Sequence, residues 1–597
     1  MRLTVFAGQS FVKIDHIFFN RLDAKETKVR RLAAQLPVKL DGNRRYHAGG
    51  RHRPGPPMSG PAVYAGGKPM RVEQLELNHH RATGPAGKKI KEDNRNMAGF
   101  VNVTATPSGK RSEARGLLLA GKWFWQNYPK AVEIKRDSVV ADLIPRQRKL
   151  FSVPRGMAKQ HTFFLAFHDG LTDNREVSDF AYALQRWPMP SAPSEYYQQT
   201  GQVWDYFPAY AEQYQRLEAA FREFYPPDRE DLTSAALGQR AWGLKHYGDW
   251  VTCGWSKDST TFDPDARDIY YINNEYDTAH VLAMLFLRQP DIIRWWGAEA
   301  HALHTMDVDT AHHVPGKETQ RNATLMTNCQ YRHCYQHIGG IQSLDESYTG
   351  AGLSHTFAEG INDYYHLTGD ARARRQVLGT ARQLAEFTLH PKGYVWGLSR
   401  NLGWGMLIMG AAHMIQPDKR VIEAANAMID KVINVEMDPD GKVYGSPFHP
   451  NSWSDRGISL GVRGLIKWHQ ATGCEKTKKL FLGLMNQFVE MCFGAEGLPA
   501  ASNWPEGGKP TTATQGFANL EGLAYAFDLT GDRKFLDAGL GALAHAVGWV
   551  LDPESDPGMK SGSEFFMRCL RGPFRFLALA HEHGILQRMP EAGRWVP

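Results

Sequence analysis

The sequence predicts a multidomain β + α protein, with an N-terminal antiparallel β-sandwich-like domain followed by an (α/α) toroid. Three observations lead to this fold class. The first part of the chain contains short runs of alternating apolar and polar residues, a proline cluster follows Trp187, and a helical unit recurs in the second half. We therefore assign residues 1–185 to an antiparallel β domain and residues 186–597 to the toroid, the expected catalytic domain.

The strands of the β domain are indicated by alternation. Alternation with mostly polar neighbours, as in a half-buried strand, is seen at Leu3 and Val5 and then at Val12, Ile14, His16 and Phe18. Residues 41–96 are rich in glycine, proline and basic residues, and we expect them to form a long loop or insertion. The chain begins directly in a strand-like run, so we expect this domain to be incomplete at its N-terminus. Further strand-like runs lie at 100–104, 116–124, 131–134 and 161–167.

A repeated unit indicates the toroid. In each copy a helix ends at a glycine, which takes the left-handed turn, and in two copies the following aspartate caps the next helix. The unit therefore predicts helical hairpins, and about six of them closing on themselves would form an (α/α) toroid. We expect the first helix of each hairpin to line the inside and the stretch before it to form the rim of a central cavity. The clearest copies are 360–370, 464–473 and 522–532.

Composition and charge limit the classes of binding partner and the cellular compartment that we expect. The 597 residues carry a net charge of +7, which favours an anionic partner, and the chain has no recognisable nucleic-acid module. No apolar run approaches the ~18 residues of a membrane span. The N-terminus lacks the pattern of a signal peptide, so we expect the chain as given to be cytoplasmic, or secreted or periplasmic if its N-terminus is truncated. The expected partner is an acidic polysaccharide or oligosaccharide, and the oligomeric state stays open.

The stretch 331–370 has the highest density of reactive side chains. An arginine, two histidines and a tyrosine crowd into 331–337, which is typical of a site for an acidic substrate, although a well-satisfied polar loop is the alternative. Beyond it, His355 and Glu359 fall on the polar stripe of a helix that we expect to face inward. The candidate catalytic residues are Arg332, His333, Tyr335, His337 and Tyr348.

Other stretches before the inner helices combine polar and aromatic side chains. Asp277 also fits the N-cap of the helix that follows it. No cofactor is expected, although Asp307, Asp309, His312 and His313 leave open a divalent cation at a spacing that is not a zinc or calcium signature. The candidate substrate-binding residues are Asn274, Glu275, Tyr276, Asp277, His280, His312, His313, His355, Glu359, Arg400, Trp404 and Arg456.

Four motifs occur in an order that resembles a known enzyme family. The chain from about residue 95 onward is similar to the exo-acting rhamnogalacturonan lyases of polysaccharide lyase family 26. The resemblance implies β domains before a C-terminal α/α toroid, with the family's first β domain absent or truncated here. It also implies cleavage of the pectic polysaccharide rhamnogalacturonan. The motifs are 125–131 (WQNYPKA), 153–159 (VPRGMAK), 273–277 (NNEYD) and 354–360 (SHTFAEG).

The chemistry of a lyase suggests roles for the candidate residues. A cation must neutralise the uronate carboxylate, a base must remove the C5 proton, and an acid must protonate the leaving oxygen at C4. We assign Arg332 to the carboxylate, and either His333 or His337 to the base, because a histidine titrates near neutrality. Tyr335 or Tyr348 would be the acid.

Three other functions remain compatible with the sequence. A glycoside hydrolase would use a pair of carboxylates, for which Glu275, Asp277 and Glu359 are candidates. Paired histidines on a toroid could epimerise a free sugar, and a non-catalytic glycan-binding protein is the remaining alternative. Analysis of the product distinguishes these classes, because only a lyase leaves an ultraviolet-absorbing 4,5-unsaturated uronate.

Overall fold

A computed structural model describes the chain apart from several internal segments and the C-terminal end. The segments left undescribed are 25, 50–63, 98, 109, 171–172, 188, 202, 204–205, 209–213, 216, 220–241, 250, 253–269, 272–273, 275, 314–333, 336–352, 392–394, 444–454, 493–512, 552–570 and 587–597. Only the backbone is described for 64–65, 111, 251–252, 270–271, 334–335, 354, 455–459, 491–492, 513–517, 545 and 548–551. The chain forms two compact units, residues Met1–Met189 with Gln239–Tyr247, and residues Pro190–Gly238 with Gly248–Pro597.

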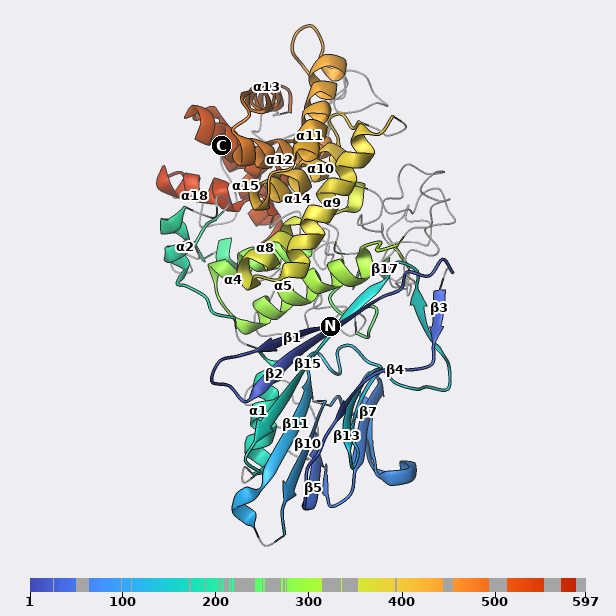
Figure 1. Ribbon diagram of the computed structural model, residues 1–597. Helices are drawn as coiled ribbons and strands as arrows, with labels where there is room; N and C mark the ends of the chain where they lie inside the picture. The colour runs from blue at the N-terminus through green and yellow to red at the C-terminus, as the bar shows by residue number, and fades with distance from the viewer. Residues whose placement is uncertain are drawn as a thin grey trace. The chain divides into compact units, whose positions relative to one another are not determined.

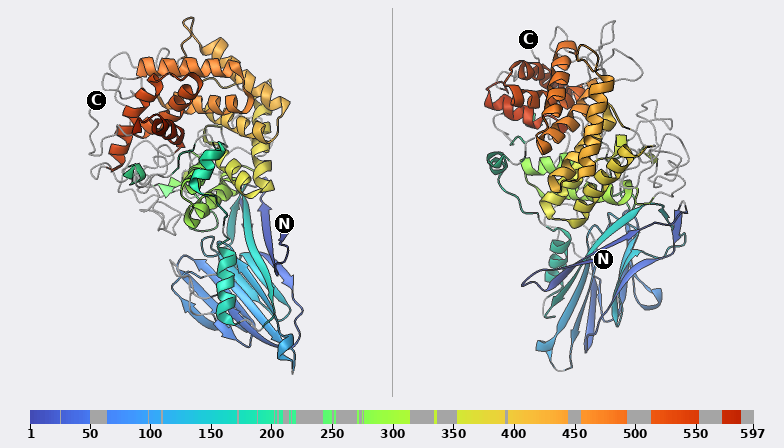
Figure 2. Two further views of the ribbon diagram at one scale, coloured as in Figure 1. Left: turned by 90° about the vertical axis from the view of Figure 1, so that its left-hand side faces the viewer. Right: turned by 45° about the horizontal axis from the view of Figure 1, so that its top comes forward.

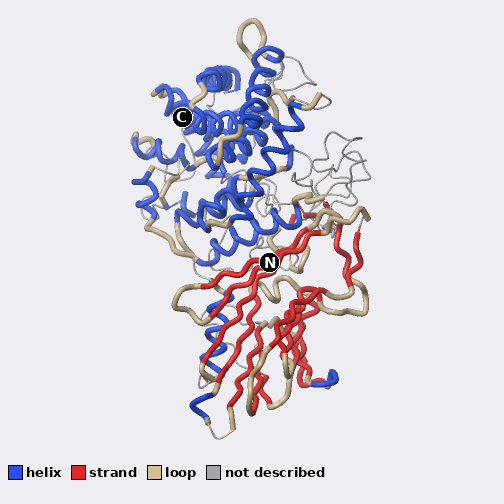
Figure 3. The backbone as a smooth tube through the Cα atoms, in the orientation of Figure 1, coloured by secondary structure: helices blue, strands red, loops and turns tan. Residues whose placement is uncertain are grey.

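The first unit is built from antiparallel sheets (Figure 3). One sheet has the order β1-β2-β15-β11-β10-β5-β6 and another the order β4-β13-β12-β7-β8-β9, while β14 pairs with β3. The strands are β1 (Arg2–Val5), β2 (Phe11–Phe19), β3 (Glu26–Val29), β4 (Leu32–Pro37), β5 (Asn43–Ala48), β6 (Tyr64–Gly66), β7 (Met70–Glu76), β8 (His79–Thr83), β9 (Lys89–Asp93), β10 (Phe100–Thr106), β11 (Arg115–Gly121), β12 (Lys130–Ile134), β13 (Ser138–Ile144), β14 (Phe151–Pro154) and β15 (Ala158–His168).

Strand β11 shows why this unit has two apolar layers. Its residues alternate between faces, so Leu117 and Leu119 join a core shared with the second sheet, as in a β-sandwich. Leu118 points the other way and packs with Val177 of helix α1 (Asn174–Gln185), which covers the outer face of the seven-stranded sheet. A strand buried on both faces reads as a continuous apolar run, which is how 116–120 appears in the sequence.

The prediction of a long loop at 41–96 was wrong for much of that range. Strands β5, β7, β8 and β9 lie within it. In β7, Met70 and Val72 are buried, and Arg71 between them forms ion pairs with Glu133 on the neighbouring strand β12 and with Asp142 on β13. These charged residues made the sequence resemble a loop and hid the alternation of apolar and polar residues. In the structure they stabilise the sheet through ion pairs on its polar face.

The second unit is helical, and its helices follow one another around a ring from green through yellow and orange to red (Figures 1 and 2). The main helices are α2 (Ser194–Thr200), α4 (Thr278–Arg288), α5 (Ile292–His304), α8 (Glu359–Thr368), α9 (Ala371–Leu389), α10 (Arg400–Ile415), α11 (Lys419–Lys431), α12 (Asp455–Thr472), α13 (Glu475–Cys492), α14 (Ala513–Thr530), α15 (Lys534–Leu551) and α18 (Phe574–Glu582). Short strands β16 (Val251–Thr252), β17 (Tyr270–Tyr271) and β18 (Cys334–Tyr335) form a small antiparallel sheet.

The hairpin turns form as the repeat predicts. After α8, Gly369 has φ of 69°, and Asp370 accepts the N–H groups of Arg372 and Ala373 at the start of α9. Gly473 and Gly531 have φ of 66° and 69° at the equivalent turns after α12 and α14. A left-handed backbone is accessible to glycine at little cost, which explains the glycine in each copy.

The helices divide into inner and outer sets. Along the ring α4, α8, α10, α12, α14 and α18 contact one another in that order. Helix α10 is buried continuously from Leu402 to Ala412, whereas α11 buries one stripe that includes Val421, Ala425 and Met428. Gly464 of α12 allows close packing, because a Cβ there would stand 2.6 Å from the carbonyl oxygen of Gly403. The fold class, antiparallel β sheets followed by an (α/α) toroid, is therefore confirmed.

The ring closes between its last and first inner helices. The guanidinium of Arg288 at the end of α4 lies over the ring of Phe574 at the start of α18, 5.2 Å from its centroid. Arg571, just before α18, donates to the carbonyl oxygen of Tyr276 at 3.4 Å, just before α4. None of the described helices is long and apolar enough to cross a membrane.

Candidate functional site

The beginning of α4 has an unusual backbone. Asn274, Tyr276 and Asp277 have φ of 53°, 64° and 67°, a left-handed conformation that costs non-glycine residues free energy and recurs at functional sites. The Asp277 side chain does not cap α4, the helix that it precedes. It accepts instead the N–H groups of Glu359 at 2.9 Å and Gly360 at 3.1 Å, at the start of α8. Asp277 therefore joins two inner helices.

Gly360 makes this junction possible. A Cβ at that position would lie 2.5 Å from Oδ1 of Asp277 and 2.5 Å from Cβ of Ala279. Because any larger residue would push the two helix ends apart, the glycine in the motif SHTFAEG is required by the close approach of α4 and α8.

Arg571 lies behind the junction. Its guanidinium is 3.8 Å from Oδ2 of Asp277 and forms an ion pair with Glu359. It also lies 5.0 Å from the centroid of the Trp404 ring, and its side chain is only 2% exposed. Burial raises the pKa of the Asp277 carboxyl, and the charge of Arg571 opposes that rise. Arg571 thus balances two carboxylates that are largely removed from water.

Trp404 belongs to an aromatic cluster next to Arg571. Its ring meets Phe357 edge-on at 4.8 Å and lies 6.1 Å from Tyr276, and Trp404 is 1% exposed. The guanidinium of Arg400 lies 5.1 Å from the centroid of the Tyr276 ring. In this arrangement Trp404 supports the backbone of the predicted rim, and a role in sugar stacking remains a prediction.

His280 of α4 and Asp363 of α8 form a pair in which both side chains have strongly altered acidity. Nδ1 of His280 is 2.7 Å from Oδ2 of Asp363, and the two side chains are 13% and 25% exposed. Burial raises the pKa of Asp363 to about 7, against the charges of Lys467 and His366. Burial, reinforced by the charge of Arg571, lowers the pKa of His280 well below its usual range. Near neutral pH the pair can therefore either donate a proton or accept one.

Lys467 brings a cation from α12 to the same place. Its Nζ lies 3.6 Å from Oε1 of Glu359, and its side chain is 22% exposed. One turn earlier, Arg463 pairs with Glu521 of α14 at 2.8 Å. Side chains from α4, α8, α12 and the segment before α18 thus meet in one charged network, which we call the ring network: Asp277, His280, Glu359, Asp363, Lys467 and Arg571. Its solvent-reaching members can contact a polar ligand.

Several predicted site residues lie outside this network. Asn274 is buried among Asp249, His301 and Thr305. His355 is buried in the short helix Leu353–His355. His312 lies 2.6 Å from the carbonyl oxygen of Met306, and His313 follows it at the end of that segment. The structure brings Tyr276, Asp277, His280, Glu359, Arg400 and Trp404 together.

The predicted catalytic loop falls mostly outside the described residues. Arg332, His333, His337, Tyr348 and the binding candidate Glu275 are not described. For Tyr335 and Arg456 the backbone alone is described: Tyr335 pairs with Tyr270 in the small sheet, and Arg456 lies in the first turn of α12. Their roles stay predictions.

Sequence reasoning missed Asp363, Lys467 and Arg571. Asp363 stands four residues after Glu359, so the same helical periodicity that selected His355 and Glu359 includes it. Arg571 occupies the stretch before the last inner helix, where the repeat predicts part of the rim. Lys467 lies inside a repeat copy, and only the contact of α12 with its neighbours shows that it reaches Glu359.

The cation candidates are not brought together as a set. Asp307 pairs with Arg372 at 2.5 Å, and His312 is held by Met306. Asp309 lies instead beside His304 and Asp249. A divalent cation bound by the predicted four residues remains a prediction without geometric support.

Comparisons with known proteins give similarity in the path of the chain. No family model and no curated protein matches this sequence. Among solved structures, an unsaturated glucuronyl hydrolase specific for heparin is similar with 12% identity and a TM-score of 0.41, over 62% of this chain and 99% of that one. A sugar epimerase from a ruminal bacterium is similar with 9% identity and a TM-score of 0.39, over 60% of this chain and 98% of that one. A polysaccharide lyase is similar with 14% identity and a TM-score of 0.39, over 51% of this chain and 91% of that one. The assignment of the toroid rests on the chain's own helices and their contacts.

Proposed function

We propose that this protein is a polysaccharide lyase that cleaves a uronate-containing glycan by β-elimination, acting from the chain end on rhamnogalacturonan. The ordered motifs that resemble family 26 lyases support the reaction and the substrate. The observation that supports an enzymatic role is the His280–Asp363 pair. Its two side chains have altered acidity and lie among charged side chains of the inner helices. Strong pKa shifts with a specific partner are a mark of catalytic groups.

The elimination requires one proton to leave and another to arrive. The C5–H bond breaks, its electron pair forms the C4–C5 double bond, and the C4–O4 bond breaks as the leaving oxygen takes a proton. His280 is uncharged near neutral pH because its pKa is lowered, and that is the form that accepts a proton. Asp363, with a pKa of about 7, is protonated in a large fraction of molecules and can donate.

The cations of the ring network suit a negatively charged sugar. Lys467 is partly exposed and can meet the uronate carboxylate, whose neutralisation makes the C5 proton easier to remove. The predicted set Arg332, His333, Tyr335, His337 and Tyr348 could fill the same roles, with an arginine at the carboxylate and a tyrosine as the acid. The two sets make different predictions for mutagenesis.

A glycoside hydrolase is the second candidate, because one observation favours it. Glu359 and Asp363 stand one helical turn apart on α8, and burial raises the pKa of Asp363 to about 7. A protonated carboxyl beside an ionised one is the arrangement that glycosidases use.

Product analysis on a panel of pectic and other acidic polysaccharides tests the proposal. We expect an ultraviolet-absorbing 4,5-unsaturated uronate, released one unit at a time from rhamnogalacturonan. Uptake of water from labelled solvent without this absorbance would establish the hydrolase instead. An unchanged mass would indicate an epimerase, and binding without a new product would indicate a glycan-binding protein.

Variants then separate the two catalytic sets. If the ring network performs the chemistry, His280→Gln and Asp363→Asn lose activity while His333→Ala and His337→Ala keep most of it. If the predicted loop performs it, one of the two loop histidines abolishes kcat with near-normal KM, and Arg332→Ala raises KM and lowers kcat together. Full activity in all of these variants would rule out both assignments.

A further inference from the structure

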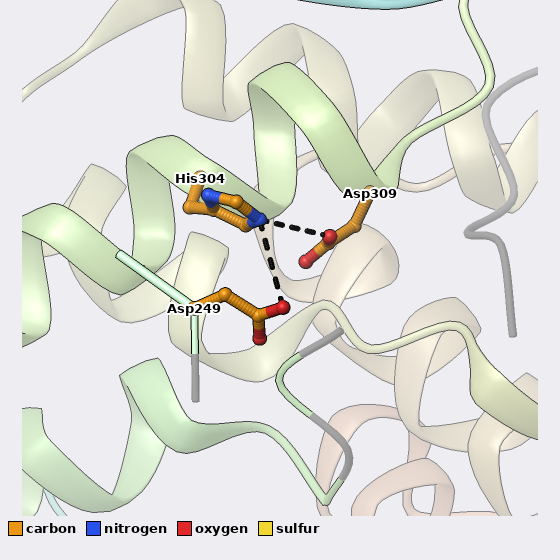
Figure 4. Close-up of side chains that lie close together, drawn as sticks. All are labelled: Asp249, His304 and Asp309. Atoms are coloured by element: carbon orange, nitrogen blue, oxygen red, sulfur yellow. Dashed lines mark ion pairs between the residues drawn. The ribbon is translucent and has the colours of Figure 1, made fainter. Parts of the chain in front are cut away.

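A second cluster of ionisable side chains lies elsewhere in the helical unit. Asp249, His304 and Asp309 are 0%, 0% and 1% exposed, and Figure 4 shows their polar atoms turned toward one another. They come from two places in the chain, the segment before β16 and the end of α5. Among the described residues, these three are the histidine and acidic side chains whose donor atoms gather closely enough to hold a metal ion.

A π-helical turn brings two of the three together. Residues Thr305–Asp309 form a π-turn directly after α5, closed by the N–H of Thr310 donating to the carbonyl oxygen of Thr305 at 3.1 Å. The wider π-turn aligns residues five apart, and His304 and Asp309 are separated by five. In a regular α-helix their side chains would point in different directions.

The distances suit a small cation with short bonds. Nε2 of His304 is 3.1 Å from Oδ1 of Asp309 and 3.9 Å from Oδ2 of Asp249, and all three donor atoms lie within 4.8 Å of one another. In a tetrahedral zinc site with bonds of about 2.0–2.1 Å, donor atoms stand roughly 3.3 Å apart. Shifts of under about an ångström would bring these donors to that separation.

Asn274 orients both carboxylates. Its backbone N–H donates to Oδ1 of Asp249 at 2.9 Å, and its Nδ2 lies 3.4 Å from Oδ2 of Asp309. The oxygens that face His304 are the opposite ones, Oδ2 of Asp249 and Oδ1 of Asp309. Asn274 is itself held by Nδ1 of His301 at 2.6 Å. Such outer partners, which fix the direction of the ligands that touch the ion, are characteristic of metal sites.

The donor types suit a cation at this place. Carboxylate oxygens and an imidazole nitrogen are ligands that bind divalent metal ions in proteins. One imidazole and two carboxylates form a ligand set typical of zinc, and of manganese or iron, whereas calcium and magnesium prefer oxygen ligands alone.

We propose that Asp249, His304 and Asp309 bind one divalent cation of the zinc type, and that this site fixes the turn before α4. The coupling runs through Asn274, which touches both carboxylates and stands three residues before Asp277, the residue that holds the start of α8. The cation is a structural one in this proposal, distinct from the ring network and independent of the reaction catalysed.

Metal content and thermal stability of the full-length chain test the site. We expect about one zinc per chain by mass spectrometry after purification, and loss of it on dialysis against a chelator. Adding ZnCl₂ in large excess over Kd should then raise Tm by roughly 3–8 °C, since ligand at 100-fold over Kd stabilises appreciably. CaCl₂ should not. No bound metal and no response of Tm to ZnCl₂ or MnCl₂ would overturn the proposal and leave an ion pair of protonated His304.

Matched variants locate the site. Asp309→Asn and His304→Gln should lower the zinc content to near zero and remove the response of Tm to zinc. His312→Gln is the control, because His312 lies eight residues beyond His304 and its Nε2 faces the carbonyl oxygen of Met306. Equal loss in the control would overturn the location. If both site variants fail to fold, the visible spectrum of the cobalt-loaded wild type decides, since tetrahedral cobalt supports the site and a hydrated octahedral ion contradicts it.

Discussion

Two histidine–aspartate pairs in the described part of the helical unit have the same composition and opposite surroundings. His280 and Asp363 lie 2.7 Å apart with side chains 13% and 25% exposed, and Lys467 and Arg571 stand near them. His304 and Asp309 lie 3.1 Å apart, both fully buried, with a further carboxylate from Asp249 beside them. The first pair can exchange protons with a ligand or solvent, whereas the second is enclosed together with the carboxylate of Asp249.

The difference teaches that residue type alone does not decide what such a pair does. Access to solvent and nearby cations suit the first pair for proton transfer. Enclosure and a third ligand atom suit the second for holding a cation. The experiments below either separate the two pairs or show that they act alike, and they run from the largest expected effect to the smallest.

Removing the acid of the exposed pair should have the largest effect. Asp363→Asn keeps the shape but cannot supply the carboxyl proton, and losing a proton-transfer group costs about 10²–10⁴-fold in rate. We expect kcat on the identified substrate to fall within this range while the circular dichroism spectrum of the folded protein stays the same. Asp528→Asn is the control, since Asp528 pairs with Arg575 on the outside of the ring network. Wild-type kcat in Asp363→Asn would remove the pair from the chemistry.

Removing Arg571 should mainly affect stability. Its side chain is 2% exposed, and its guanidinium contacts the carbonyl oxygen of Tyr276 and the carboxylates of Asp277 and Glu359. Breaking a buried ion pair costs about 3–5 kcal/mol. Arg571→Met should lower the free energy of unfolding by this amount in guanidinium titrations followed by circular dichroism.

The matched variant Arg575→Met removes a pair that is more open to solvent. Such pairs contribute about 0–1 kcal/mol, so the midpoint should hardly move. Equal losses in the two variants would mean that burial does not distinguish these arginines.

The pH dependence of stability should also separate the two pairs. The folded pKa of Asp363 is raised from 3.8 to about 7, so its contribution to stability is fully present below pH 4 and is lost as pH rises through 7. A tenfold change in proton affinity between the folded and unfolded chain corresponds to about 1.4 kcal/mol. The contribution of Asp363 is smaller than this conversion gives, because solvent reaches a quarter of its side chain.

The variant Asp363→Asn lacks this titration. Its free energy of unfolding, measured relative to wild type, should therefore rise steadily between pH 4 and pH 8. The lowered pKa of His280 acts in the opposite sense, removing stability as pH falls below 6.5 in both proteins. A difference between wild type and variant that stays constant with pH would mean that Asp363 titrates normally.

Replacing Lys467 should give the smallest effect on the fold. Its pair with Glu359 is partly exposed, and such pairs contribute about 0–1 kcal/mol to stability. Lys467→Met should therefore keep Tm nearly unchanged but raise KM for a uronate substrate by up to about tenfold, since a charged ligand loses a partner. The neutral analogue of that substrate serves as the control ligand. An equal rise in KM for both would show that Lys467 does not meet the carboxylate.

Periodic features of the chain were predictable because their causes are local. The turns at Gly369, Gly473 and Gly531 follow from the conformational freedom of glycine, and the capping by Asp370 follows from unsatisfied N–H groups. The site was predictable in part, since Asp277, His280 and Glu359 stand at the starts of inner helices. Arg571 and Lys467 could not be assigned, because their shared partner Glu359 lies 212 and 108 residues away from them in the sequence.

By itself, the sequence determined the order of a β part and a helical part, the hairpin turns and the glycines that allow close packing. These depend on backbone preference and on the period of apolar residues, both of which act over a few neighbours. Only the tertiary structure decided that Asp277 caps a helix other than its own, that Asp363 titrates near 7, and that Asp249 meets His304. Burial and the distance between charges set these properties, and both arise only when segments far apart in the chain pack together.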